Sequence, residues 1–342
     1  MMRCPEVVGI VTAVVWSCFS PFGIAQQTTP TPAAYQDAQP TASEQEQLGA
    51  QWFDRMVQAL RTANFDATLV QVQGDRIEPL RWLHGLDEEN AEVELMMRLN
   101  GPDFRVLRFG QQTAYYQPAA NSYSLRSDVV HGLLPTGFYR PFTRLADYYR
   151  AIPAGGARIV DRDSQHIRLV SRDNLRYGYS LWIDRETGLL LKSAVVTPQG
   201  EVVEQLQLTS VEFYDRFPAN LADLRGVPRP PMLVDSQAIQ AMQYRLEPQW
   251  LPQGFELRRM NHHQLPVTGT AADYFMFSDG LTQFSVYVAK RELEYQEPLA
   301  LEGAESLYSR AIGDEVVTVV GALPLPTLKQ ITDNIVIMKV AP

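Results

Sequence analysis

Residues that commonly carry catalytic chemistry do not form a familiar motif in this sequence. The chain contains no Gly-x-Ser-x-Gly nucleophile elbow, no His-Glu-x-x-His pair, no P-loop and no Gly-x-Gly-x-x-Gly fingerprint. Such motifs position a nucleophile, a zinc ion or a nucleotide phosphate, so their absence argues against the commonest hydrolases, zinc proteases and nucleotide-binding enzymes. We therefore predict a protein that binds another molecule and is not an enzyme.

One pair of carboxylates has a spacing that catalysis could use. Asp161 and Asp163 are two positions apart, which on a strand would place both side chains on one face, as some glycosidases require. Arg158 and Arg162 flank them, and an exposed, solvated strand explains the pattern more simply.

Histidines give no sign of a metal site. Of the five histidines only His262 and His263 are close in sequence, and adjacent side chains on a strand point to opposite faces. They could not share a metal ion without further ligands. We expect no metal and no cofactor.

The charge balance argues against nucleic acid as a partner. The chain carries 30 basic and 39 acidic residues, a formal net charge of −9, which is the wrong sign for electrostatic binding of a polynucleotide. The only lysines are Lys192, Lys290, Lys329 and Lys339. The excess of arginine suits carboxylate or phosphate ligands, but a GC-rich genome explains it more simply.

The N-terminal segment has the features of a secretory signal peptide. Arg3 precedes an apolar run of thirteen residues, Val7 to Phe19, which is too short for a stable membrane span of about 20 residues. Gly23 and Ala25 have the small-residue spacing that signal peptidase recognises. We predict that residues 1–25 are removed on export.

Both cysteines, Cys4 and Cys18, lie within this segment. The exported chain then has no thiol, and so no disulfide, no thiolate nucleophile and no cysteine metal site. A lipoprotein signal is the alternative for Cys18, but the bulky Trp16 does not fit that pattern. We therefore expect packing alone to stabilise the folded protein.

Composition and periodicity divide the exported chain into four parts. Residues 26–42 are rich in Gln, Pro and Thr and predict a disordered leader. Residues 43–216 begin with an amphipathic helix, capped by Ser43 and Glu46, and continue as short strands. A proline-rich linker is predicted at 217–236 and a second domain at 237–342.

The strand pattern predicts an α+β fold. In the first domain we expect strands at 65–73, 76–84, 93–99, 104–109, 112–117, 157–163, 165–171, 176–183, 189–197 and 201–213. So many consecutive strands favour a large antiparallel unclosed β-barrel with capping helices. In the smaller α+β domain we expect strands at 244–246, 256–261, 273–278, 283–288 and 316–320, and a helix at 326–334.

A long loop, residues 127–156, interrupts the strands of the first domain. It is rich in Gly and Pro and carries Phe138, Tyr139 and Phe142, with a short helix expected near 142–150. Loops of this length often cover a functional site. A lid that only plugs the open end of the sheet is the alternative.

Several stretches resemble one family, the RseB/MucB periplasmic regulators of envelope stress signalling in Gram-negative bacteria. In the first domain they are Leu80-Arg81 with His84, Leu99 to Pro102 with Arg108, Asp147 to Tyr149, Arg158 to Arg162, Tyr179 to Asp184 and Gly188-Leu189. In the second domain they are Trp250 to Phe255, Phe277 to Leu281 with Phe284 to Val286, and Val320 to Pro324. The specific pieces are Trp250 to Phe255 and Ser278 to Leu281, in this order and at this spacing. The long leader departs from the family pattern.

The resemblance implies a periplasmic protein without catalytic activity that binds the periplasmic part of a membrane-spanning anti-sigma factor. This binding would shield the anti-sigma factor from regulated proteolysis until lipopolysaccharide or another lipid causes release. The first domain would resemble the lipoprotein carriers of the LolA and LolB type. A periplasmic lipid or lipoprotein carrier is the alternative function, and a homo-oligomer is compatible with the sequence.

An apolar groove in the first domain could take acyl chains. Its predicted lining is Leu69, Val93, Leu95, Met97, Leu99, Phe104, Tyr115 and Trp182. Ten buried methylenes would contribute about 8 kcal/mol against an association cost of about 4–15 kcal/mol, so several chains or a headgroup contact are needed. The same residues are also compatible with an ordinary core.

Arginines are the candidates for an anionic headgroup, because guanidinium groups bind phosphate well. They are Arg98, Arg105, Arg108, Arg140 and Arg144. For the protein partner, the candidates lie in the second domain: Trp250, Phe255, Asp279 and Phe284. Most of these large side chains would also suit a domain core.

Overall fold

The computed structural model describes residues 41–118, 121–233, 242–264, 271–291 and 298–340. The predicted signal peptide and nearly all of the predicted leader lie outside these residues. Of the part of the chain that the structure describes, no helix combines the length and the apolar character needed to cross a membrane.

Helix α1 (Ala42–Thr62) opens the described chain and is amphipathic, as the spacing predicts. Its buried side includes Phe53, Met56 and Leu60. The predicted capping box of Ser43 and Glu46 is wrong by two residues, because Thr41 caps the helix: the Glu44 N–H donates to the Thr41 hydroxyl and the Glu44 carboxylate accepts from the Thr41 N–H. Residues 41–44 and 43–46 both fit the Ser/Thr-x-x-Glu pattern of a capping box, and the helix begins at the earlier of the two.

The first domain is built on one antiparallel sheet of eleven strands. Their order is β6-β5-β4-β3-β2-β1-β11-β10-β9-β8-β7. The strands are β1 (Phe65–Gln73), β2 (Arg76–Leu86), β3 (Glu92–Arg98), β4 (Arg105–Phe109), β5 (Gln112–Tyr116), β6 (Tyr123–Arg126), β7 (Tyr149–Ile159), β8 (Arg162–Ser171), β9 (Gly178–Asp184), β10 (Leu190–Val196) and β11 (Val202–Phe213). Since β6 and β7 end the order without pairing to each other, the predicted unclosed sheet is confirmed.

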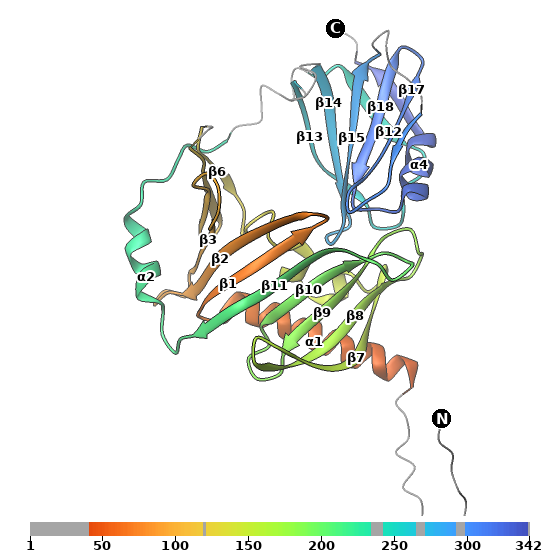
Figure 1. Cartoon of the computed structure of the whole chain (residues 1–342). Coiled ribbons are helices and arrows are strands. Elements are labelled where there is room, and N and C mark those ends of the chain that lie inside the picture. Colours follow the sequence, from red (N-terminus) through yellow and green to blue (C-terminus); the bar gives the residue numbers. More distant parts are fainter. Residues whose placement is uncertain (1–40, 119–120, 234–241, 265–270, 292–297, 341–342) are drawn as a thin grey trace, which may run out of the picture. The chain divides into compact units, whose positions relative to one another are not determined.

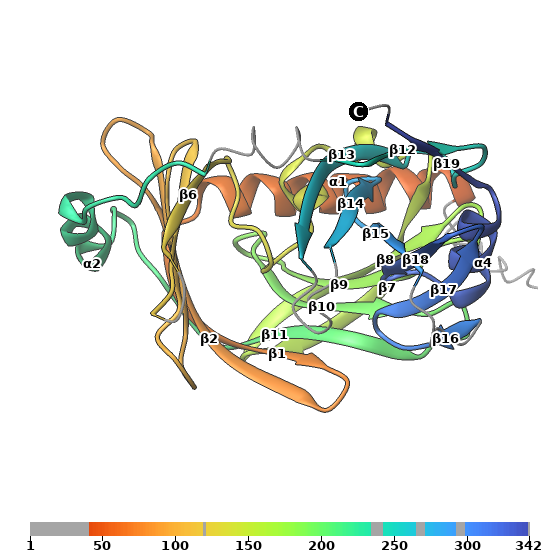
Figure 2. The ribbon, with the colours of Figure 1, turned by 90° about the horizontal axis from the view of Figure 1, so that it is seen from above.

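The sheet curves, and α1 lies along its concave inner side (Figures 1 and 2). Phe53, Met56 and Leu60 of α1 join the inner side chains of the strands in one large core that also contains Phe65 and Trp82. An amphipathic helix on one face of an open sheet leaves the other face to be covered by something else.

The hairpin between β7 and β8 overturns one expectation from the sequence. Val160 and Asp161 have φ values of 52° and 61°, the left-handed pair of a two-residue type I′ turn. Asp161 is therefore in the turn, where it pairs with Arg158, while Asp163 is on β8 opposite Arg158. The predicted strand 157–163 and the carboxylate pair on one strand face are wrong, because the chain reverses between them.

Between β6 and β7 the loop 127–148 contains only two 3₁₀ turns, η1 (Thr136–Tyr139) and η2 (Phe142–Arg144). The short helix expected near 142–150 is wrong, because β7 already begins at Tyr149. Pro135 and Pro141 precede the two turns and adopt extended backbone angles.

After β11 the chain forms helix α2 (Ala219–Ala222) and the 3₁₀ turn η3 (Asp223–Gly226). The second domain then contains a sheet in the order β13-β14-β15-β18-β17-β16 and a separate pair, β12 with β19. Its elements are β12 (Tyr244–Pro248), β13 (Glu256–Gln264), β14 (Ala271–Ser278), β15 (Gln283–Lys290), β16 (Leu299–Leu301), β17 (Ser306–Ile312), β18 (Glu315–Gly321), α4 (Leu325–Asp333) and β19 (Ile335–Lys339).

Helix α4 packs on one side of the six-stranded sheet (Figure 1), and Leu328 and Ile331 are buried in the core of this domain, as predicted. The same core receives Tyr244 and Ile335 from the pair β12 and β19. The predicted α+β fold, with a smaller α+β domain after the open sheet, is confirmed.

Candidate functional site

The loop 127–148 is anchored by aromatic side chains and lines two cavities. Phe138 and Phe142 contact Phe53 of α1, with ring centroids 5.9 and 5.4 Å apart, and Tyr139 is buried. Residues 131–136 instead form part of the cavity walls. The loop thus fills part of the inner face of the sheet, as a plug would, and also borders two cavities, as a loop covering a site would.

Arg61, in the last turn of α1, holds the two ends of this wall together. Its guanidinium donates to the backbone carbonyls of Asp128 (2.8 Å) and Tyr139 (3.3 Å). It also forms ion pairs with the carboxylates of Asp128 (3.1 Å) and Glu92 (3.3 Å). A hydrogen bond from Arg140 and the two nearby guanidinium charges lower the pKa of Asp128 to about 2. The anchor is therefore charged at neutral pH.

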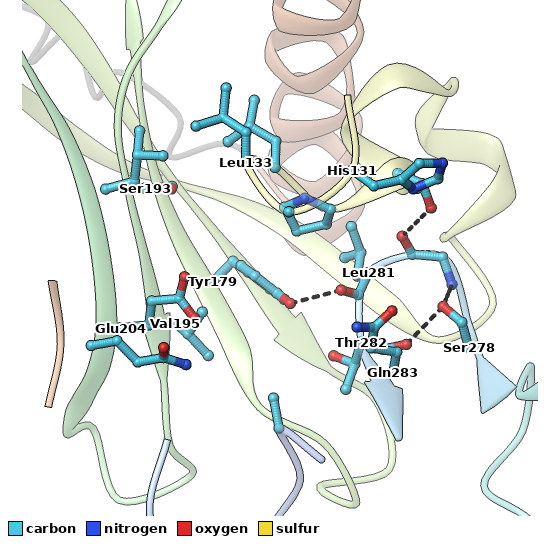
Figure 3. A pocket seen from close by; sticks show the side chains of 18 of the residues that line it. His131, Leu133, Tyr179, Ser193, Val195, Glu204, Ser278, Leu281, Thr282 and Gln283 are labelled. Atoms are coloured by element: carbon cyan, nitrogen blue, oxygen red, sulfur yellow. Dashed lines mark hydrogen bonds between the residues drawn. The ribbon is translucent and has the colours of Figure 1, made fainter. Parts of the chain in front are cut away.

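The first cavity has a volume of about 250 Å³ and lies between the loop, β9–β11 and the turn 278–283 (Figure 3). Its apolar lining is Leu133, Leu134, Tyr179, Val195, Leu206 and Leu281. Its polar lining includes Gln73, Ser193, Glu204, Gln205, Thr282 and Gln283. The lining is thus divided about evenly between apolar and polar side chains.

The turn 278–283, which closes one side of this cavity, is organised by Asp279. One oxygen of its carboxylate accepts hydrogen bonds from the backbone N–H groups of Leu281 (2.9 Å) and Thr282 (2.8 Å). The other oxygen accepts from Arg176 at 2.5 Å. The side chains of Arg176 and Asp279 are both fully buried.

Further hydrogen bonds join the turn to the first domain. The N–H of Gly137 donates to the carbonyl of Gly280 at 2.7 Å, and the hydroxyl of Tyr179 donates to the carbonyl of Leu281 at 3.0 Å (Figure 3). A Cβ atom at position 137 would lie 2.9 Å from that Gly280 oxygen and 2.8 Å from the Leu281 side chain. Only glycine permits this approach.

Arg176 is surrounded by acceptors and aromatic rings. Besides Asp279 it donates to Asp173 (2.7 Å) and to the backbone carbonyl of Gln253 (2.8 Å), and it lies 5.0 Å from the ring centre of Phe255. Burial acts to lower the pKa of Arg176, but the hydrogen bond with Asp173 and the Asp279 charge outweigh it and the pKa is raised. Arg176 is therefore a permanent cation in this junction.

A second cavity, also of about 250 Å³, shares Gln73, His131 and Gly132 with the first. Its lining combines apolar and charged side chains: Leu80, Met96, Phe104, Arg76, Glu78 and Arg98. Arg98 lies 4.6 Å from the ring centre of Phe104 and 3.6 Å from Glu78.

The two cavities together are suited to one kind of ligand. Apolar side chains line both. The second also contains two guanidinium groups, Arg76 and Arg98, which share the carboxylate of Glu78 at 2.8 and 3.6 Å. Such a lining fits a molecule with an apolar chain and an anionic group.

The predicted groove residues are divided between the two faces of the first sheet. Leu69 and Tyr115 are buried in the inner core with α1, and Phe104 lines the second cavity. Phe104 is the member of the predicted set that borders one of these two cavities.

The remaining groove candidates face elsewhere. Val93, Leu95 and Met97 alternate along β3 with Glu94 and Met96, so their side chains point to the outer face, where they form a separate apolar cluster. Leu99 is exposed, and Trp182 stacks on His166 with ring centroids 4.4 Å apart.

Of the predicted headgroup arginines, Arg98 lines the second cavity. Arg105 pairs with Asp103 on the surface at 2.8 Å. Arg140 pairs with Asp128 at 2.9 Å and so supports the loop. Arg144 lies in η2 and is exposed.

Arg108, the fifth predicted headgroup residue, is part of a buried charge network. It donates to Glu94 (2.7 Å) and Glu92 (2.6 Å), and Trp82 donates to the other oxygen of Glu94 at 2.7 Å. Burial acts to raise the pKa of Glu92, but His84 and Arg108 lower it to about 2. The guanidinium of Arg108 thus pairs with carboxylates inside the sheet.

The residues predicted for partner binding are mostly interior. Phe255 and Phe284 are buried in the second core, with ring centroids 5.2 Å apart, and Trp250 packs against the same core. Asp279 organises the cavity turn. These four residues stabilise the second domain and the turn.

Among the described residues no group of three or more His, Cys, Asp or Glu side chains could hold a metal ion. His262 has a carboxylate partner instead: its Nδ1 lies 2.5 Å from Asp273. The other oxygen of Asp273 accepts from the N–H groups of Gln243 and Tyr244 at 2.7 Å each, so this carboxylate fixes the start of β12.

Two residues of the site, Arg61 and Arg176, were not identified from the sequence. Arg61 is in the last turn of an amphipathic helix, where a basic residue is ordinary, and Arg176 follows a polar turn. Their partners are distant in sequence, so no local pattern marks them. The sequence did mark the other half of this contact. The Ser-Asp-Gly-Leu motif at 278–281, which carries the family resemblance, forms the turn whose Asp279 binds Arg176.

Comparisons with known proteins cover both domains. The family model described as the MucB/RseB N-terminal domain matches residues 49–233, and the one described as the MucB/RseB C-terminal domain matches residues 239–336. The protein named sigma-E factor regulatory protein RseB in Haemophilus influenzae is 29% identical over 295 residues, which is 86% of this chain and 93% of that protein. Its namesake in Salmonella typhimurium is 30% identical over 278 residues, 81% of this chain and 87% of that protein.

A solved structure shows the same fold. The complex of Pseudomonas aeruginosa MucA and MucB contains a chain that matches this one with a TM-score of 0.67 at 25% identity. The match covers 86% of this chain and 99% of that chain.

Proposed function

This chain belongs to the MucB/RseB family, and from that premise we propose that it binds the periplasmic part of a membrane-spanning anti-sigma factor and shields it from regulated proteolysis. The observation that carries the proposal is the MucB structure solved with MucA, which this chain matches over 99% of the MucB chain. Relatives named as regulators of a sigma factor support the same pathway. The protein acts in the periplasm by binding alone, without a catalytic step.

We further propose that the two adjoining cavities bind part of a lipid molecule. Lipid binding would lower the affinity of this protein for the anti-sigma factor. Their apolar walls suit an acyl chain, and Arg98 and Arg76 suit an anionic group. The turn 278–283 both lines the first cavity and carries hydrogen bonds between the domains. A ligand in the cavity therefore acts directly on residues that hold the second domain in place.

The partner proposal is tested with the chain lacking residues 1–25 and the periplasmic segment of the anti-sigma factor of the same organism. We expect saturable binding by titration calorimetry, and slower cleavage of that segment by its regulated protease when the chain is present. Absence of both binding and protection would contradict the proposal. Copurification of acylated cargo without an anti-sigma factor would favour the carrier function instead.

The lipid proposal is tested by native mass spectrometry with lipid A fragments at micromolar concentration. Val195→Trp fills the first cavity and is expected to remove the adduct. Ile77→Trp, at an exposed position of β2, adds the same side chain outside the cavities and is the matched control. Equal adducts in both variants, or none in the unmodified chain, would contradict a lipid site here.

A further inference from the structure

The segment between the domains is docked on the first sheet. Residues 217–233, which we call the strap, leave β11, pass α2 and reach the edge strand β6 (Figure 1). On the way they pack on the outer face of β2–β6, opposite the face that packs on α1. The strap therefore covers part of the surface that an open sheet would otherwise expose.

The beginning of the strap is fitted closely to β2. A Cβ atom at Gly85 would lie 2.8 Å from Pro218 and 2.9 Å from Phe217, so glycine is needed where the strap crosses. Leu221 of α2 is fully buried in a cluster with four outward side chains of the sheet: Leu83, Val93, Leu95 and Leu107. This cluster is separate from the core that borders the cavities.

The middle of the strap is held by an aromatic surface. The hydroxyl of Tyr116 donates to the carbonyl of Pro228 at 3.1 Å. The guanidinium of Arg229 lies 4.6 Å from the ring centre of Phe109, a cation–π contact. Arg225 pairs with Asp87 at 3.1 Å.

The end of the strap is held by one fully buried residue of β6, Ser124. Its hydroxyl donates to the carbonyl of Pro230 at 2.7 Å, and its N–H donates to the carbonyl of Pro231 at 2.8 Å. Its own carbonyl accepts from the N–H of Leu233 at 2.8 Å. Met232 thus forms a parallel bridge with Ser124, on the side of β6 that the sheet leaves unpaired.

This donor set matches the chemistry of proline. Pro228, Pro230 and Pro231 have no N–H to offer, and the surface uses their carbonyls only. Aromatic rings with hydroxyl donors are a recurrent way of binding extended proline-containing peptides, which lose little entropy on docking. The sheet thus has the features of a peptide-binding site, and its own chain occupies it.

We propose that the outer face of β4–β6 is a binding site for an extended proline-containing peptide, with residues 227–233 as its tethered, releasable ligand. Release would uncover the free edge of β6 and would lengthen the tether of the second domain by at most roughly 25 Å. This inference does not rest on the proposed function, since it concerns the face opposite the cavities.

Two matched variants separate the surface from its ligand. The surface variant Tyr116→Phe/Ser124→Ala removes two donors and leaves the strap unchanged. The strap variant Arg229→Ala/Pro230→Gly/Pro231→Gly leaves the surface unchanged but removes the cation and the stiffness of the ligand. Circular dichroism first establishes that both remain folded.

Limited trypsin digestion of the whole chain reports release, because the Arg225–Gly226 bond directly precedes residues 227–233 and is expected to become more accessible when they detach. Cleavage there is expected to become about tenfold faster in both variants, the effect of losing two modest interactions. A fluorescent peptide with the sequence of residues 226–233 is then expected to bind the strap variant and not the surface variant. Unchanged cleavage in both variants, or equal peptide binding to both, would overturn the proposal.

Discussion

Two arginines are buried in this protein in nearly the same way. Arg108 is paired with one fully buried carboxylate, Glu94, and one partly exposed carboxylate, Glu92. Arg176 is paired with a fully buried Asp279 and a partly exposed Asp173. In both cases two carboxylates compensate the cost of burying one guanidinium.

The two networks differ in what they hold together. Glu94 is directly opposite Arg108 on neighbouring strands, so the register of one hairpin brings this pair together. Asp279 is 103 residues from Arg176 and belongs to the other domain. The same electrostatic device therefore stabilises a sheet in one place and joins two domains in the other.

The largest effect is expected from Glu94→Gln, which keeps the size of the side chain but removes the buried charge. Loss of one partner of a buried ion pair costs about 3–5 kcal/mol, measured as the free energy of unfolding in urea. The double variant Arg108→Met/Glu94→Leu is expected to recover part of this loss, because the buried cation is removed together with Glu94, whereas the Trp82 N–H loses its acceptor. A loss below about 1 kcal/mol in Glu94→Gln would show that the network does not stabilise the sheet.

Asp279→Asn is expected to lower the free energy of unfolding by about 3 kcal/mol and also to change the shape of the unfolding transition. Because Asp279 joins the two domains, we expect unfolding to separate into two transitions, the first domain retaining its original midpoint. Tryptophan fluorescence and far-ultraviolet circular dichroism should then give different midpoints. Coincident midpoints would contradict a role in joining the domains.

The contribution of Glu92 should depend on pH. Its folded pKa of about 2 is below its ordinary value of 4.5, so its stabilisation is present above pH 4.5 and is lost as the pH falls towards 2. Glu92→Gln is expected to lose about 3 kcal/mol at pH 7 and less than about 0.5 kcal/mol at pH 2, where Glu92 is about half protonated in the folded protein. The exposed Glu88→Gln is the control, and a difference that is constant with pH would contradict the prediction.

Arg61→Lys tests whether the loop wall depends on a planar guanidinium. A single ammonium group cannot satisfy two backbone carbonyls and two carboxylates at once, so we expect a loss of about 1–2 kcal/mol. Hydrogen exchange of residues 131–136 should increase, while Arg55→Lys on the exposed side of α1 should leave it unchanged. Unaltered exchange in Arg61→Lys would show that the loop is held by its aromatic residues alone.

The smallest effect is expected at the surface. Arg105 and Asp103 form an ion pair of good length, 2.8 Å, but both side chains are more than half exposed. Arg105→Gln is expected to cost at most about 1 kcal/mol and to lose even that at high salt. A loss comparable with that of Glu94→Gln would mean that burial is not what distinguishes the two buried networks.

The sequence was a good guide to the regular elements of the first domain. Alternation along β1, β3 and β11 and the helical spacing after residue 42 were strong enough to locate these elements within a few residues. The family resemblance, carried by stretches in both domains, is confirmed by the two family models. The pattern failed at β6, β16, β17 and β19, which are short or lie outside regular alternation. It also failed at β7, most of which falls within the predicted loop 127–156.

The candidate site was much less predictable. Alternation correctly showed that Val93, Leu95 and Met97 share a face of β3. It could not show that this face is the outer one, which the strap covers, and not the one that joins the inner core. Arg98 and Phe104 border the second cavity, whereas the neighbouring Arg108 is paired inside the sheet. Arg98 and Arg108 lie on neighbouring strands but differ in role, because a fully buried carboxylate pairs with Arg108 and not with Arg98.

The amino-acid sequence by itself determined the periodicity of the strands, the family, the negative charge and the absence of thiols after the predicted signal peptide. Only the tertiary structure decided which face of the first sheet packs on α1, where the strap docks, and that Asp279 meets Arg176. The physical reason is that periodicity and composition are properties of neighbouring residues. Burial and ion pairing depend instead on segments brought together from distant parts of the chain.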